Sequence, residues 1–510
     1  MKDRMTPLPR IVRRFARAAL APLLACALLA GAAAAPQPCA AARLATDEIA
    51  GITLAESGLT DRAPDVDAAS GMLVGPDGRV LWARDADGRR AMASITKIMT
   101  AIVVLEEADL DEVVTVSQAA SQVPYATGLV AGERRTVREL LELALVASSN
   151  DAAQALAEHL GPGAGAFVDL MNDRAAELGL KGTRFANPHG LDAAGHYSRA
   201  DDIAALFAIA LEFPEYRRIV ALESVTLPVY GTRTVAKTVE STDHLLGVYD
   251  GLIGGKTGFT DDADYCFAGC AERDGLELTA IVLGARTSDT RFAETTRLLD
   301  WGFENLTLET IATTTETVAA VPLAPDPDQT IELRFAETTS TPVFALDGPI
   351  TRRLDTAPSV GLPVFEGQLL GEATLTQGER ELATLPLVAA RDIASAEETV
   401  GLVPVSDYLD RTVLARASAE AIDVPEFDPD IAVERAVLLD PDVDAPVDPG
   451  ERVGTIAYAQ GGEVFLEVPV VAAEAVPAPG ALERIGIWFQ RAVRWITGAP
   501  TMASPVLAAS

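Results

Sequence analysis

The sequence predicts an α/β domain over residues 67–308, followed by two tandem small all-β domains and a C-terminal amphipathic helix. Within 67–308, strand-like runs stand at both ends and helix-period runs stand between them. This order is typical of a sheet flanked by helices with an inserted helical part. After residue 308 the helical periodicity stops, and short Val, Thr and Leu runs alternate with Pro, Asp and Gly, as in small β domains.

The N-terminus has the composition of an export signal. The arginines at positions 10, 13, 14 and 17 precede the uncharged segment 18–35, which is rich in Ala and Leu, and small residues offer cleavage sites between 34 and 42. We therefore expect residues 1–42 to be a signal peptide, with an uncleaved anchor helix as the alternative. We expect residues 43–66 to form a polar leader and the mature chain to act outside the cytoplasmic membrane.

The charge and the Cys and His content exclude several kinds of function. A formal net charge of −33 leaves no basic face for phosphates, so no nucleic-acid partner is expected. The four histidines are too few and too scattered for a convincing zinc site, so no metal is expected. No cofactor is expected either. Cys266 and Cys270 lie on one predicted strand about 13 Å apart, which is too far for a disulfide.

Patterns inside 67–308 place its elements in order. Two strand runs flank a Gly-Pro-Asp-Gly turn at 75–78, as in a hairpin. Helical spacing follows, and strand runs then return before a closing helix. The predicted helices are 94–107, 137–159 and 291–303, and the predicted strands are 72–74, 79–82, 224–228, 265–271 and 278–284.

The region after residue 308 contains one sequence pattern twice. Pro363–Gly371 matches Pro446–Gly454 at an offset of 83 residues, and an upstream match slips to 82. A period of this length indicates a duplicated domain and not a solenoid. We expect copy 1 over 309–392 and copy 2 over 393–475.

Residues 476–498 are predicted to form a linker and an amphipathic helix, with a tail over 499–510. Apolar residues recur at helical spacing, two tryptophans flank that stripe, and three arginines supply cations in an acidic protein. An interfacial membrane helix needs this composition, so we expect residues 482–496 to bind the membrane surface. The alternative is a helix docked on its own β domain; Pro477 and Pro479 in the linker favour the membrane.

Ser94 and Lys97 are the first candidate catalytic pair. They stand at positions i and i+3 where a helix is predicted to begin, so the amine can lie beside the hydroxyl. A serine needs an adjacent base to act as a nucleophile, and a lysine can be that base when burial or charge lowers its pKa. The pair alone is weak, because so short a motif also occurs by chance.

Two further motifs follow in order. Ser148-Ser149-Asn150 ends an apolar helical run, where it could equally be an ordinary cap. Lys256-Thr257-Gly258 precedes the strand at 265–271, where a cation, a hydroxyl and a glycine can hold a substrate carboxylate and let backbone come close.

Taken together, S-x-x-K, S-x-N and K-T-G in this order resemble the motif set of penicillin-binding proteins and β-lactamases. The wording around them is similar to low-molecular-mass D,D-carboxypeptidases of the penicillin-binding protein 5 type, peptidase family S11. The strings that carry the resemblance are 93–101 (ASITKIMTA), 147–153 (ASSNDAA), 185–191 (FANPHGL), 195–198 (GHYS) and 301–303 (WGF).

The resemblance implies a penicillin-binding/β-lactamase-like transpeptidase domain, with the β region as a stalk and the terminal helix as a membrane anchor. It also implies a reaction on peptidoglycan stem peptides. Ser94 would be acylated by the penultimate D-alanine carbonyl, which releases the terminal D-alanine. Lys97 would be the general base, and Ser148 would relay protons to the leaving amine. β-Lactams would acylate Ser94 as inhibitors.

The resemblance also implies the substrate-binding residues. Asn150 would hold the substrate amide and Lys97, and the third motif would bind the terminal carboxylate, with Arg291 as a further carboxylate partner. The backbone N–H groups of Ser94 and Phe259 would form the oxyanion hole. The full set is Asn150, Lys256, Thr257, Gly258, Phe259 and Arg291.

The chain departs from the family pattern at a few points. Ser149 stands where glycine or alanine is common, Asp264 adds negative charge near the site, and the β domain is duplicated. Three alternatives stay open: a D,D-endopeptidase of the same fold, a β-lactamase, and a wall-binding scaffold. No glutamate between Glu158 and Glu240 has an asparagine four residues later, which disfavours the β-lactamase.

Overall fold

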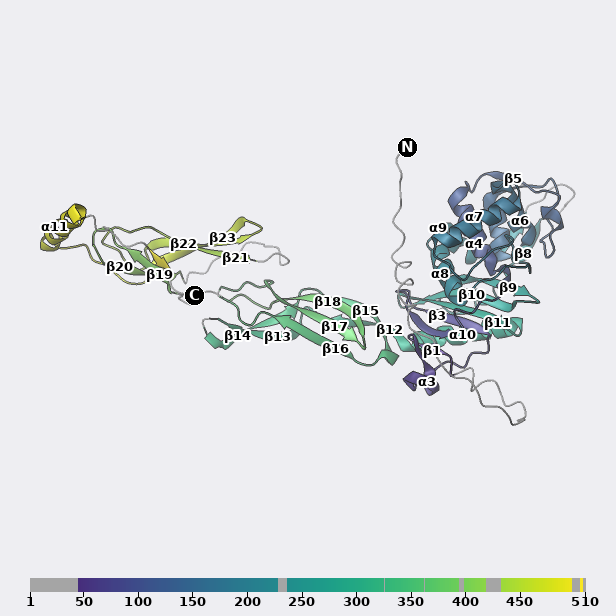
Figure 1. The fold of residues 1–510 in the computed structure, drawn as a ribbon, viewed down its shortest axis with the longest axis horizontal. Helices are drawn as coiled ribbons and strands as arrows, with labels where there is room; N and C mark the ends of the chain where they lie inside the picture. Colours follow the sequence, from purple (N-terminus) through teal and green to yellow (C-terminus); the bar gives the residue numbers. More distant parts are fainter. Residues whose placement is uncertain are drawn as a thin grey trace. The chain divides into compact units, whose positions relative to one another are not determined.

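The computed structural model describes residues 45–227, 236–324, 326–361, 363–393, 399–418, 433–497 and 505–507. The expected signal peptide lies outside the described residues. The chain divides into two compact units, which are described one at a time (Figure 1). Unit 1 comprises the residues up to Leu308 and Pro342–Leu346; unit 2 comprises Glu309–Thr341 and the residues from Asp347 onward.

Unit 1 is built on a seven-stranded antiparallel sheet in the order β2-β1-β4-β3-β11-β10-β9. The predicted hairpin is present as β3 and β4, with Leu73 opposite Trp82. β9 is an edge strand of this sheet and carries the third motif. The bounds are β1 Glu48–Ile49, β2 Ile52–Thr53, β3 Ser70–Val74, β4 Val80–Arg84, β9 Leu252–Thr260, β10 Asp264–Arg273 and β11 Leu276–Ala285.

Alternate residues of the central strands point into two separate hydrophobic cores. On β11, Ile281 and Leu283 face the core formed with the helical part, whereas Leu278 and Val282 face the core that α10 covers. Figure 1 shows α4, α6 and α7 on one side of the sheet, and α10 beside β1 and β11.

The remaining elements of unit 1 form the helical part, its short hairpins and the segments at its ends. The helices are α3 Leu54–Ser57, α4 Lys97–Glu107, α5 Val137–Val146, α6 Asn150–Leu160, α7 Ala164–Glu177, α8 Ala200–Leu211, α9 Pro214–Val220 and α10 Ser288–Asn305. The short strands are β5 Val113–Thr115, β6 Arg134–Thr136, β7 Ser224–Leu227 and β8 Lys237–Glu240.

The segment 43–66 differs from the expected leader, because its described part is integral to unit 1. β1 pairs with β4, and Ile49 and Leu54 are buried in the core beneath α10. A buried ion pair holds the segment as well, with Arg84 Nη2 donating to Asp47 over 2.6 Å. Only a few apolar residues of the segment are buried in this core, so its composition did not predict the packing.

Unit 2 contains two antiparallel sheets whose strand pairing repeats along the chain. β16, β17 and β18 correspond to β21, β22 and β23, and every bound is shifted by 83 residues. A register shift between Leu369 and Gly371 recurs between Arg452 and Gly454. The pairing thus follows the repeat seen in the sequence.

The strands of the first β region are β12 Leu306–Ala312, β13 Thr317–Leu323, β14 Asp326–Phe335, β15 Thr339–Phe344, β16 Ile350–Thr356, β17 Leu369–Gln377 and β18 Arg380–Ala389. Those of the second are β19 Thr399–Pro404, β20 Thr412–Ala417, β21 Val433–Leu439, β22 Arg452–Gln460, β23 Glu463–Ala472 and β24 Val506–Leu507. β12 and β15 form a separate two-stranded pairing.

The amphipathic pattern near the C-terminus forms the helix α11, Ala481–Thr497. Ile487 packs against the core of the second β sheet, whereas Trp488 and Phe489 are exposed. Among the helices described, none combines the length and the apolar character needed to cross a bilayer.

Candidate active site

Ser94 lies in a tight turn that runs directly into α4. The turn is the 3-10 segment Ala93–Thr96, and Ala93 adopts a left-handed φ of +48°. Such a conformation is strained for a residue with a side chain and is concentrated at functional sites. Because the turn continues into the helix, Lys97 follows one turn later, and its Nζ donates a hydrogen bond to Ser94 Oγ over 2.8 Å.

Lys97 is fully buried and makes two further hydrogen bonds. Its Nζ donates to Asn150 Oδ1 and to the His189 carbonyl oxygen, both over 2.7 Å. Burial holds the pKa of Lys97 well below its ordinary value; the positive charge of Lys256 lowers it further, and Asp151 opposes the shift. A lysine with a lowered pKa can be neutral near physiological pH and can accept a proton.

The second motif lies in the turn between α5 and α6. The Ser149 side chain caps α6 by accepting from the Ala152 N–H, which fixes Asn150 as the first residue of that helix. Ser148 has a left-handed φ of +55°, and its Oγ accepts a hydrogen bond from Lys256 Nζ over 2.9 Å. Ser148 therefore links the second motif to the third.

The third motif lies on β9. Lys256 is buried, and burial lowers its pKa to about 7; Arg291 lowers it as well, and Asp243 opposes the shift. The hydroxyl of Thr257 lies 2.6 Å from that of Thr242. Lys256 and Thr257 thus place a cation and a hydroxyl on the edge strand nearest to Ser94.

Gly258, Phe259 and Arg291 complete the predicted set. A Cβ on Gly258 would lie 2.9 Å from the Met92 carbonyl oxygen, so glycine lets β9 pass close to the turn before Ser94. The exposed ring of Phe259 stacks on Tyr265 at 4.3 Å. Arg291 Nη1 donates to the Gly258 carbonyl oxygen over 3.1 Å, so this guanidinium contacts the backbone of β9.

Sequence reasoning gave no role to the segment His189–Gly190, which contacts both Ser94 and Lys97. The His189 carbonyl oxygen accepts from Lys97 Nζ and, over 3.3 Å, from Ser94 Oγ. Gly190 has a φ of +92°, and a Cβ there would overlap the Ala93 carbonyl oxygen. The glycine of the Asn-Pro-His-Gly string was the sequence feature that could have indicated this close backbone approach.

Asp151 was also missed, although it directly follows Asn150. It is fully buried, and its carboxylate accepts hydrogen bonds from the backbone N–H groups of residues 127–129 over 2.9–3.2 Å. Asn150 Nδ2 donates to the Pro124 carbonyl oxygen over 2.8 Å in the same loop. An acid in the first turn of a helix is normally a cap, so nothing in the sequence indicated that Asp151 binds a distant loop.

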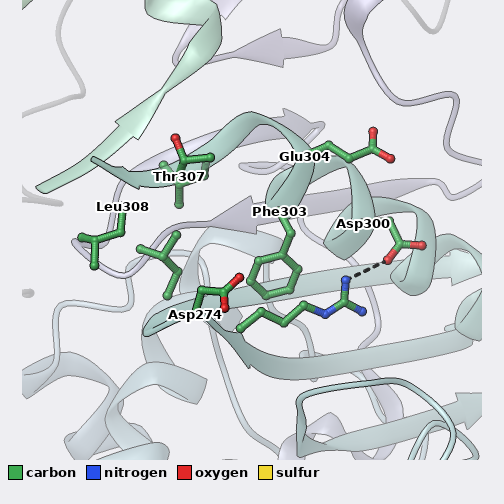
Figure 2. A pocket seen from close by; sticks show the side chains of 9 residues that line it. Asp274, Asp300, Phe303, Glu304, Thr307 and Leu308 are labelled. Atoms are coloured by element: carbon green, nitrogen blue, oxygen red, sulfur yellow. Dashed lines mark ion pairs between the residues drawn. The ribbon is translucent and has the colours of Figure 1, made fainter. Parts of the chain in front are cut away.

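A cavity of about 620 Å³ lies apart from the motifs, where α10 meets the ends of β10, β11 and β12 (Figure 2). Arg273 is one of its lining residues, with its guanidinium 4.9 Å from the Phe303 ring centre and 3.6 Å from Asp300. None of the predicted site residues lines this cavity. We therefore assign the site to the three motifs and not to this cavity.

Unit 1 has a penicillin-binding-protein-like fold: a seven-stranded sheet with an inserted helical part, and three motifs that meet at the edge strand β9. A C-terminal β region follows it in the chain. Comparisons with known proteins agree. The Peptidase_S11 family, described as D-alanyl-D-alanine carboxypeptidase, matches residues 57–287. The family described as penicillin-binding protein 5, C-terminal domain, matches residues 397–478.

Individual relatives carry the same name. The chain is 34% identical over 344 residues to D-alanyl-D-alanine carboxypeptidase DacF of Bacillus subtilis, with 65% of this chain and 87% of DacF covered. It is 36% identical over 261 residues to DacA of Escherichia coli, with 47% and 62% covered. The chain belongs to the D-alanyl-D-alanine carboxypeptidase family S11.

Solved structures give the same result. The D-alanyl-D-alanine carboxypeptidase DacD from Francisella tularensis has a TM-score of 0.50 at 26% identity, and the alignment covers 65% of this chain and 94% of that one. Penicillin binding protein 6B from Escherichia coli has a TM-score of 0.50 at 28% identity, with 64% and 96% covered.

Proposed function

We propose that this chain is a serine D-Ala-D-Ala carboxypeptidase that removes the terminal D-alanine from peptidoglycan pentapeptides. One observation carries the proposal: Lys97 Nζ lies 2.8 Å from Ser94 Oγ, in surroundings that lower the lysine pKa. That arrangement suits a lysine acting as general base toward a serine nucleophile.

In the proposed reaction, Ser94 Oγ bonds to the carbonyl carbon of the penultimate D-alanine while its proton passes to Lys97 Nζ. The C–N bond to the terminal D-alanine then breaks, and the leaving nitrogen takes a proton through Ser148. Water next hydrolyses the Ser94 ester, which restores the hydroxyl and releases the shortened peptide.

The other site residues are assigned to binding. Lys256 and Thr257 would hold the terminal carboxylate, and Asn150 would hold the substrate amide. The backbone N–H groups of Ser94 and Phe259 would stabilise the oxyanion. Arg291 would act on the carboxylate through β9, since its guanidinium donates to the backbone of that strand.

The test is a pair of assays on the purified protein. We expect release of D-alanine from a pentapeptide that ends in D-Ala-D-Ala, and a stable penicillin adduct that peptide mass spectrometry maps to Ser94. No adduct, or an adduct on another residue, would overturn the mechanism. Cleavage of cross-linked dimers without release of D-alanine would replace the carboxypeptidase with an endopeptidase, and rapid hydrolysis of penicillin would replace it with a β-lactamase.

We also propose that the protein acts at the outer face of the cytoplasmic membrane, after removal of a signal peptide within residues 1–42. In this proposal α11 lies in the membrane interface, and the β copies 309–392 and 393–475 form the stalk. The exposed apolar side chains of α11 and its three arginines support the proposal.

Charged substitutions in α11 test this attachment. The double variant Trp488→Glu, Phe489→Glu should weaken sedimentation with anionic vesicles by at least about tenfold, because each side chain would otherwise bury a large apolar surface in the interface. Val464→Glu is the matched control, because Val464 is a similarly exposed apolar residue on β23. Equal sedimentation of the double variant and the control would reject the anchor.

A further inference from the structure

Asp243 is a buried acid beside the third motif that the proposed reaction does not use. Only 5% of its surface is exposed, in the segment that follows β8. Its Oδ1 accepts a hydrogen bond from the Leu245 N–H over 2.9 Å. Its Oδ2 is buried and has no hydrogen-bond partner among the described residues. A buried carboxylate oxygen in this state is costly unless cations lie close to it.

The position of Asp243 is set by its neighbour, Thr242. The Thr242 hydroxyl lies 2.6 Å from that of Thr257, on the motif strand β9. The Thr242 N–H donates to the Val146 carbonyl oxygen over 3.0 Å, at the end of the helix that leads into the second motif. These two contacts hold the segment that carries Asp243 between the second and third motifs.

The cations near Asp243 are Lys256 and Arg291, and both are buried. Lys256 interacts unfavourably with Arg291 and also with the buried Lys97. Positive charges close to one another lower the pKa of a lysine and so favour loss of its proton. Each lysine has one buried acid that opposes this effect: Asp151 opposes it for Lys97, and Asp243 for Lys256.

We propose that Asp243 is a positioning residue that keeps Lys256 charged, so that Lys256 can bind the carboxylate of the terminal D-alanine. Asp243 acts through Lys256 and does not touch the substrate. Arg291 also interacts favourably with Asp243, so the same carboxylate offsets the repulsion between Lys256 and Arg291. The identity of the carboxylate rests on the proposed function, whereas the effect on Lys256 does not.

The direction of the pH effect follows from the charges. The pKa of Lys256 is lowered to about 7, so its amine loses its proton, and its hold on a carboxylate, as the pH rises through neutrality. Burial raises the pKa of Asp243 to about 6, so Asp243 is ionised over that range. Removing its charge takes away an influence that raises the Lys256 pKa. Loss of carboxylate binding should therefore begin at a lower pH.

Lysine NMR on the full chain tests this directly, because the sequence has only five lysines. With ¹³Cε-labelled lysine, the Lys256 signal is assigned by its absence in Lys256→Gln and is then titrated. Asp243→Asn should shift that titration toward lower pH, and Asp243→Glu should return it toward the wild-type value. Asp262→Asn, which removes an exposed acid six residues after Lys256, should leave it in place.

The kinetic counterpart is the KM for the pentapeptide. At pH 8, Asp243→Asn should raise KM by about tenfold for each unit by which the Lys256 pKa falls, and the difference should vanish near pH 5.5. An unshifted Lys256 titration, or the same shift in Asp243→Glu, would overturn the role of the Asp243 charge even if D-alanine is released. A shifted titration without any release of D-alanine would leave that role intact and overturn the proposed function instead.

Discussion

Replacing Lys97 by methionine should lower the rate constant for penicillin acylation of Ser94 by about a thousandfold, and release of D-alanine should fall with it. General-base catalysis contributes a factor on the order of 10²–10⁴ to a rate, and Lys97 Nζ lies 2.8 Å from Ser94 Oγ, within reach of its proton. Methionine fills a similar volume without an ionisable group. The measurement is the time course of the penicillin adduct by mass spectrometry.

The matched control is Lys237→Met. Lys237 is exposed, and its Nζ donates to the Thr127 carbonyl oxygen, in the loop that Asp151 holds. Its loss removes a lysine and one hydrogen bond near the site but no group that touches Ser94. Acylation close to the wild-type rate in Lys97→Met would contradict the proposed mechanism. Equal losses of acylation rate in the two variants would show that the effect comes from the lost charge or from the loop structure, and not from a base at Lys97.

The acid side of the pH profile follows from the same lysine. Lys97 must be neutral to accept the Ser94 proton, and its lowered pKa makes it neutral at lower pH than an exposed lysine would be. The acylation rate should therefore fall as the pH drops through the Lys97 pKa, because the proton then occupies the base.

The sequence predicted the parts of the site that depend on local spacing. Ser94 and Lys97 are three residues apart, and one turn of chain brings them together. It could not predict Asp243, because an acid between two short strands looks like any exposed turn residue. Only the folded chain shows that Thr242 contacts Thr257 and so carries Asp243 into a buried site.

The same distinction applies to the fold. The repeat could be recognised in the sequence because both copies retain turn glycines and apolar strand runs at an offset of 83 residues, and β17 and β22 follow that offset. The strand β1 could not be predicted, because its two residues are too few to show the alternation of apolar and polar side chains that indicates a strand. It pairs with β4, and next to it Asp47 forms an ion pair with Arg84, which lies 37 residues away in the sequence. Long-range pairing of this kind leaves no local pattern to read.

Gly190 packs directly against the backbone of Ala93 and Ser94, and an alanine there should disrupt the site. Its φ is +92°, and a Cβ would overlap the Ala93 carbonyl oxygen and lie 2.8 Å from the Ser94 nitrogen. That nitrogen is one of the two proposed oxyanion donors, and the neighbouring His189 carbonyl oxygen accepts from Lys97. Relief of the overlap must move one of these groups, and loss of a single oxyanion donor costs about 10²–10³ in rate.

Gly195→Ala separates this overlap from backbone strain alone. Gly195 also has a left-handed φ, of +78°, but the nearest atom to its Cβ would be an Arg184 side-chain atom at an ordinary 3.6 Å. Both alanines carry the cost of a left-handed backbone, about 1–3 kcal/mol, and only Gly190→Ala adds the collision. We expect Gly190→Ala to lose at least about a hundredfold in the acylation rate constant, while Gly195→Ala loses thermal stability but is acylated at nearly the wild-type rate. Equal acylation of the two variants would show that the Ser94 backbone tolerates displacement, which would contradict its proposed place in the oxyanion hole.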